Sequence, residues 1–256
     1  MSAESRDVGT TTTVDRYLET IYCIAGEGEI VRPSRLAQWM GVSAPTVSDA
    51  IQRLVRDGWI TIASDRSVAL TGAGATKAAS IVRRHRILER WLTDELGFDW
   101  AAADAEADRL SSVISDEVID RIDASIGEPL TCPHGNAIPG RHPRYGDLIA
   151  LADLEPGAAA VVRRISEVAE HEARPLLRSL AEIGIGEGSR VLVTHEAEDP
   201  GHLTIVVTGR ELSLPIESAK WIRVERLGPA DPSWIPRKAR WLRQRRATAP
   251  PRAGFR

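Results

Sequence analysis

The chain has 256 residues, enough for two domains or three small ones, and 43% of them are hydrophobic, so each domain can bury a core. Its two cysteines, Cys23 and Cys132, exclude a disulfide framework. No apolar run approaches the ~18 residues of a membrane span, and the polar N-terminus has no signal-peptide core, so we expect a cytoplasmic protein.

Charge is distributed unevenly along the chain. From Asp231 to Arg256 there are eight basic residues and one acid, a net charge of +7. Because the whole chain carries −3, the remainder carries −10. An acidic body with a basic tail is typical of contact with a polyanion. A disordered solubilising tail with a short basic helix at 237–246 is the alternative.

The first helix is expected from Thr13 to the Gly-rich turn at 26–28, after a loose polar stretch at 1–11. A second helical pattern, Ser34–Met40, stops at Gly41. A third follows up to Asp57, and its apolar stripe is spaced at i, i+4, i+7 and i+8, formed by Val47, Ile51, Leu54 and Val55. Ser43 suits its N-cap, and Pro45 is tolerated in the first turn.

Two short runs of alternating strand-like pattern, at 59–62 and 68–71, then flank the polar turn 64–67. Helix, turn, helix and β-ribbon in this order predict a winged helix-turn-helix. The alternative is a helical subdomain with a hairpin that binds no nucleic acid. The start of the third helix would reach base edges through Ser43, Pro45, Thr46, Ser48 and Asp49. Phosphate or minor-groove contacts are expected from Arg35, Arg53 and Arg66, each of which could instead be a solvated surface charge.

Three further helices are expected at 71–97, 100–113 and 115–126. Ser115 is a suitable N-cap for the last of them, whose apolar face is Val118, Ile119 and Ile122. Together the three helices carry more apolar surface than a unit of this size can bury, which favours self-association.

Short strands follow the helices. We expect them at 159–165, 190–194, 203–207, 212–214 and 222–224, with one helix at 173–183. Gly-rich turns between short strands predict a small β-barrel. The fold is therefore mainly α with small β, in the following order: a winged helix-turn-helix domain at 1–76, a helical domain at 77–145, a linker at 146–157, a β-barrel at 158–227 and a basic Pro/Arg-rich tail at 228–256.

Imidazole and carboxylate groups recur at helical spacing in the middle of the chain. His85 and Glu89 are four residues apart, as are Asp104 and Asp108, so each pair lies on one helix face. Such a mixed set suits Mn²⁺, Fe²⁺ or Zn²⁺, although a salt-bridged face among the neighbouring arginines is the alternative. Cys132 and His134 could be a metal pair, but the sequence offers no further ligands nearby, so we expect a structural loop there. No nucleophile or acid–base pair accompanies these groups, which disfavours an enzyme.

The chain resembles the diphtheria-toxin-repressor family of metal-dependent regulators, which includes the iron-dependent regulators and the manganese transport regulators. The resemblance covers about residues 10–226. It is carried by motifs in the expected order and spacing, at 17–22, 45–48, 84–92, 115–118, 133–140 and 180–185. It implies a homodimeric repressor that binds a palindromic DNA operator, with an SH3-like, FeoA-type third domain. It also implies activation by Fe²⁺ or Mn²⁺, for which Zn²⁺ or Co²⁺ could be surrogates.

The resemblance also implies two metal sites, which must be transferred residue by residue. The ancillary site matches His85, Glu89, Asp104, Glu167 and Glu170, all of which can bind a cation. The primary site matches Arg16, Asp108, Ser111 and Ser112, and Glu19 matches a carboxylate ligand of the manganese type. Asp49 replaces a glutamine usual in the iron-type members, so the operator is expected to differ.

The serines are poor ligands and Arg16 would repel a cation, so the primary site is degenerate. We hypothesise that Arg16 and Asp108 form a charge-assisted pair in place of the metal, which would make DNA binding partly independent of metal. Two unpaired surface charges are the alternative. The sequence therefore leaves a metal-responsive regulator and a metal-independent one both open.

Overall fold

The computed structural model describes residues 4–172, 174–196 and 201–228, except for the side chains of 4–12, 170–172, 174–175 and 195–196. The predicted tail after 228, with its helix at 237–246, lies outside the described residues. The chain divides into two compact units. One comprises the described residues up to Pro143 together with Ser166–Arg178, and the other comprises Arg144–Ile165 with the described residues from Ser179 onward. No helix among the described residues is long and apolar enough to cross a membrane.

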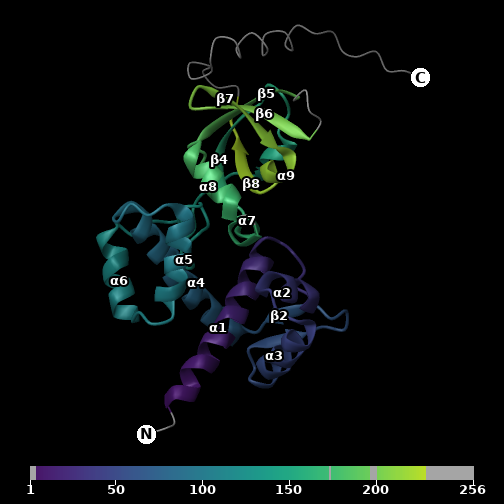
Figure 1. The fold of residues 1–256 in the computed structure, drawn as a ribbon, viewed down its shortest axis with the longest axis vertical. Coiled ribbons are helices and arrows are strands. Elements are labelled where there is room, and N and C mark those ends of the chain that lie inside the picture. The colour runs from purple at the N-terminus through teal and green to yellow at the C-terminus, as the bar shows by residue number, and fades with distance from the viewer. Residues whose placement is uncertain (1–3, 173, 197–200, 229–256) are drawn as a thin grey trace, which may run out of the picture. The chain divides into compact units, whose positions relative to one another are not determined.

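The first unit begins with the predicted winged helix-turn-helix (Figure 1). Its elements are α1 (Glu4–Gly26), α2 (Pro33–Met40), α3 (Ala44–Arg56), β1 (Ile60–Ile62) and β2 (Val68–Leu70). The expectation of a loose stretch at 1–11 is wrong from Glu4 onward, because α1 starts there rather than at Thr13. Gly9 and the four threonines at 10–13 are poor helix formers, which is why the sequence did not predict this extension.

Local chemistry sets the bounds of α2 and α3. Gly41 ends α2 in the left-handed region, at φ 64°. The Ser43 hydroxyl accepts a hydrogen bond from the Thr46 amide at 3.3 Å, which caps α3 as predicted. The buried stripe is narrower than expected, because Val55 is 40% exposed. Its opposite face is left free of neighbouring elements at the helix start, where the polar residues are exposed.

The helices α4 (Gly72–Asp94), α5 (Trp100–Ser111) and α6 (Asp116–Ser125) follow the wing in this unit. They enclose a core made of Ile87, Leu88, Leu92, Ala103, Ala107, Ile119 and Ile138. Ser115 caps α6 by accepting from the Val118 amide, as predicted, but Val118 itself is 43% exposed and does not join the core face.

The loop after α6 is fixed to α4 and α6 by guanidinium groups. Asp123 of α6 is buried and accepts hydrogen bonds from Arg83 of α4, at 2.9 Å, and from Arg141 at the end of the loop. Arg86 of α4 donates to the Ala137 carbonyl. Buried carboxylates need such partners, so this network holds the loop in one place.

The second unit contains a six-stranded antiparallel sheet in the order β3-β8-β4-β5-β6-β7. The strands are β3 (Leu148–Ala150), β4 (Ala159–Ile165), β5 (Arg190–Glu196), β6 (His202–Val207), β7 (Arg210–Pro215) and β8 (Ile222–Arg226). Five of these strands were predicted. Among the described residues no pairing joins β3 to β7, so the pairing order does not close the expected barrel.

The linker predicted at 146–157 is wrong in part, because β3 and a 3₁₀ turn, η1 (Leu151–Asp153), occupy its middle. The three residues of β3 pair with β8, which lies far along the chain. The local sequence pattern therefore did not predict this strand. The predicted helix at 173–183 is α8 (Arg174–Glu182), preceded by α7 (Glu167–Glu172), and a short α9 (Ile216–Ala219) precedes β8.

We predict that Gly74→Ala lowers the free energy of unfolding by about 1–3 kcal/mol. A Cβ at this position in the first turn of α4 would lie 2.0 Å from the Trp59 carbonyl oxygen, a backbone atom that cannot move aside alone. Gly72→Ala is the matched control, since nothing lies within 4 Å of its Cβ. The control should be neutral or stabilising by up to ~1 kcal/mol. Urea unfolding monitored by circular dichroism measures both, and equal stabilities would contradict the close packing.

Candidate metal centre and nucleic-acid interface

His85 lies at the centre of a group of four carboxylates from three helices. Its Nε2 is 3.7 Å from Glu89 of α4 and 3.7 Å from Asp104 of α5. Its Nδ1 is 3.3 Å from Asp108 of α5 and 4.0 Å from Glu19 of α1. The predicted helical spacing explains the pairs on α4 and α5. The structure adds that both pairs, and α1, face one cavity of about 120 Å³.

This arrangement requires a positive charge. Burial alone would lower the pKa of His85, but the charges of Glu89 and Glu19 and the hydrogen bonds to Asp108 and Glu89 raise it well above its usual range. Burial would raise the pKa of Glu89, but the imidazoles of His85 and His134 hold it well below its usual range. Burial raises the pKa of Glu19. In the absence of an ion, protonation of His85 offsets only part of the negative charge of the four carboxylates.

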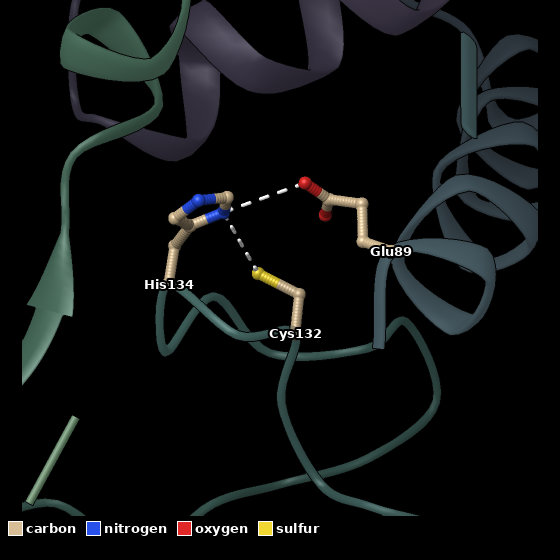
Figure 2. Close-up of side chains that lie close together, drawn as sticks. All are labelled: Glu89, Cys132 and His134. Atoms are coloured by element: carbon tan, nitrogen blue, oxygen red, sulfur yellow. Dashed lines mark hydrogen bonds and ion pairs between the residues drawn. The ribbon is translucent and has the colours of Figure 1, made fainter. Parts of the chain in front are cut away.

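A second group of candidate ligands shares Glu89. The Nδ1 of His134 is 3.4 Å from the Oε1 of Glu89 and 3.8 Å from the Sγ of Cys132, and Figure 2 shows the three side chains converging. All three are buried, and the indole of Trp100 packs edge-on against the His134 ring at 5.2 Å. We expected only a structural loop here, because Glu89, the third candidate ligand, lies far away in the sequence. The Cys-Pro-His spacing was the one sequence signal for a metal-binding pair.

Two ancillary ligands, Glu167 and Glu170, are expected from α7, and the structure describes the side chain of only the first. Glu167 is buried and forms an ion pair with Arg86, which also lies against the metal-ligand cavity. The amide of Glu167 donates to the carboxylate of Glu27, just after α1, at 3.0 Å. Glu167 is therefore held at the cavity by α4 and by the end of α1. The side chain of Glu170 lies outside the described residues.

The residues expected at a degenerate primary site line a second cavity, which is bordered by Arg16, Glu19, Asp108, Ser111 and Ser112. Three of them, Arg16, Glu19 and Asp108, also line the His85 cavity. Within the described part of the chain, Asp108 pairs with His85 and no ion pair joins it to Arg16. The proposed Arg16–Asp108 pair is thus wrong for this structure, because the imidazole is the cation that Asp108 contacts.

The residues present fit a divalent transition ion. His85, Glu89 and Asp104 can bring one ligand atom each within 4.8 Å of one another, as can Glu89, Cys132 and His134. The buried Nδ1 of His85 and Oε1 of Glu89 have no hydrogen-bond partner of good geometry, although charged groups surround them. Imidazole, carboxylate and thiolate together suit Fe²⁺, Mn²⁺, Co²⁺ or Zn²⁺. When bound, the ion would supply fixed positive charge between α1, α4 and α5.

The start of α3 presents the residues predicted to read DNA. Ser43, Pro45, Thr46, Ser48 and Asp49 are all exposed there. Arg53 on α3 and Arg66 at the wing turn are also exposed.

Arg35 differs from the other two arginines, because Glu29 holds its Nε at 2.9 Å and its guanidinium lies over the Trp39 ring. Its side chain is 15% exposed, so a phosphate contact would compete with these partners. Arg32, which the sequence did not single out, donates to the Asp65 carbonyl and so ties α2 to the wing.

A winged helix-turn-helix joined to a buried His–carboxylate centre defines the class of metal-responsive DNA-binding proteins. Three family models match the chain: the N-terminal DNA-binding domain of iron-dependent repressors at residues 9–68, their metal-binding and dimerisation domain at 71–140, and the FeoA domain at 149–226.

The chain is 36% identical to the iron-dependent repressor IdeR of Mycobacterium tuberculosis over 227 residues, covering 84% of this chain and 97% of the relative. It is 32% identical to the diphtheria toxin repressor of Corynebacterium diphtheriae over 229 residues, again covering 84% and 97%. A solved manganese-dependent transcriptional repressor in complex with manganese superposes with a TM-score of 0.74 at 33% identity, covering 84% of this chain and all of the other.

The chain belongs to the diphtheria-toxin-repressor family of metal-dependent transcriptional repressors. The expected family, the non-enzymatic function and the FeoA-type third domain are confirmed.

We predict that Glu89→Gln lowers metal affinity at least about a hundredfold, because removing one member of a buried charged cluster costs about 3–5 kcal/mol. Glu89 belongs to both groups of candidate ligands, whereas Asp104→Asn and Cys132→Ser each affect one. Glu95→Gln, at the exposed C-cap of the same helix, is the control. Elemental analysis after anaerobic reconstitution measures retained metal. Full metal retention by Glu89→Gln would exclude both groups as the binding site.

Proposed function

We propose that this chain is a homodimeric, cytoplasmic repressor that binds a palindromic operator when Fe²⁺ or Mn²⁺ occupies the His85 centre. The observation that carries the proposal is the origin of the carboxylates around His85. Glu19 comes from α1 of the DNA-binding domain, whereas Glu89, Asp104 and Asp108 come from α4 and α5. An ion bound among them fixes α1 against the helices of the metal-binding domain.

The ion acts on DNA binding through the packing of α1. This helix packs on α2, α4 and the wing strand β2, so its position affects the whole winged helix. Without an ion, four carboxylates repel one another around a single imidazole. With an ion, the repulsion becomes attraction, and α1 holds the DNA-reading domain in one orientation. Glu167 also links these two parts of the unit, because its carboxylate pairs with Arg86 of α4 and its amide donates to Glu27 just after α1.

Dimer formation is supported by apolar side chains that the described residues leave exposed on the helical part. Leu96 is 52% exposed, Phe98 38% and Val113 77%. Side chains of this kind are stabilised by burial against a second copy. A dimer places two recognition helices on the two halves of a palindrome.

The metal-independent alternative has no observation in its favour, because the Arg16–Asp108 pair on which it depends is not formed. Binding of the promoter region in a mobility-shift assay tests the choice. We expect a chelator to weaken binding strongly and stoichiometric Fe²⁺ or Mn²⁺ to restore it, with Zn²⁺ or Co²⁺ as substitutes. Binding that is unchanged by the chelator would favour the alternative and contradict the proposal.

We further predict that Asp49→Gln changes operator preference at one base pair per half-site. An aspartate accepts a hydrogen bond from the N4 amino group of cytosine, whereas a glutamine pairs with adenine, and each such contact discriminates by about 1–3 kcal/mol. Asp57→Asn at the other end of α3 is the control and should leave preference unchanged. Selection of binding sites from a random DNA pool measures both. Identical selected sequences for Asp49→Gln and wild type would show that this residue does not read bases.

A further inference from the structure

A second cavity, of about 330 Å³, lies between α1, α4 and α5. It is much larger than the cavity at His85 and can hold a small organic molecule or a hydrated oxyanion, not only a bare ion. Arg16 of α1, Arg84 of α4, and Ser111 and Ser112 at the end of α5 line it. These are hydrogen-bond donors, at the place where the family resemblance expects cation ligands.

The carboxylates at this cavity already have cationic partners. Asp15 lies 2.8 Å from the ammonium group of Lys77. Asp108 and Glu19 both face the Nδ1 of His85. Cations outside the cavity thus offset part of the negative charge that lines it, and an ion at the His85 centre would offset more.

The donors are only weakly engaged. Arg16 forms no ion pair or side-chain hydrogen bond with any described residue. The Nε of Arg84 is buried without a hydrogen-bond partner, and the one ion pair of this residue, with the exposed Asp116, is long at 3.7 Å. The hydroxyls of Ser111 and Ser112 make only long bonds, of 3.3 and 3.4 Å, to carbonyls of their own helix.

We infer that this cavity binds a small oxyanion, a phosphate or carboxylate group, between Arg16 and Arg84. A guanidinium group offers two parallel N–H donors that match the oxygens of such an anion, and a buried, unsatisfied guanidinium nitrogen is stabilised by one. The serine hydroxyls can rotate to donate to the same oxygens. The anion joins α1 to α4 in a cavity that adjoins the His85 cavity, with Arg16, Glu19 and Asp108 lining both, so it acts as a second effector of the position of α1.

The test is calorimetric titration of the metal-free, full-length protein with inorganic phosphate and, separately, with citrate, at matched ionic strength. We expect saturable binding of at least one of them, and the one that binds identifies phosphate or carboxylate as the preferred group. Arg16→Gln and Arg84→Gln should each weaken binding about tenfold or more, since a hydrogen bond to a charged group contributes about 1.5–3 kcal/mol. Arg121→Gln on α6, an exposed arginine paired with Glu117, should bind like the wild type.

Binding of neither anion, or equal binding by wild type, Arg16→Gln and Arg84→Gln, would overturn the inference. Thermal unfolding of each variant separates lost binding from lost folding, and Arg16→Lys, which keeps the charge but loses the fork, should give intermediate affinity. Because the titration contains neither metal nor DNA, its failure leaves the proposed metal-dependent repression untouched.

Discussion

The surplus of carboxylates around one histidine is the constraint on which this protein depends. Glu89 is 1% exposed and lies between the imidazoles of His85 and His134. A buried carboxylate is stable only if a cation or strong donors surround it. Two imidazoles can supply that charge as protons, and a divalent ion can supply it more compactly. The centre is therefore stabilised by added positive charge, from protons on the imidazoles or from a bound ion.

The need for positive charge affects the conformation of the protein because the charged side chains belong to different helices and a loop. Glu19 is on α1, Glu89 on α4, Asp108 on α5, and Cys132 and His134 are on the loop after α6. The loop is held by the pairing of Asp123 with two arginines, so its ligands are preorganised. By contrast, α1 belongs to the DNA-binding domain, and charge at the centre affects where it lies. Preorganised ligands on one side and a responsive helix on the other are what a switch requires.

Much of this architecture was predictable because its signals are local. The cap at Ser43, the stop at Gly41 and the spacing of His85 and Glu89 act within one or two turns of a helix, so the sequence shows them directly. Contacts between distant segments gave no such signal. Neither the approach of Cys132 and His134 to Glu89 nor the pairing of Arg86 with Glu167 follows from any spacing. His85 and Arg16 are both cations that could pair with Asp108, and the sequence alone does not show which of them lies closer to it.

The expectation that Arg16, Ser111 and Ser112 stand where relatives have metal ligands acquires a physical meaning from this geometry. A guanidinium at this position would repel an ion placed beside it, so the candidate ion position that remains is the ancillary-type one, where Glu89 and Asp104 lie beside His85. The vacated space is then lined by donors, whose natural complement is negative charge. The two cavities share Arg16, Glu19 and Asp108 in their linings, so a cation in one and an anion in the other would attract each other and stabilise the same position of α1. If the inferred anion binds there, the exchange of cation ligands for donors would change the charge of the effector and keep its action on α1.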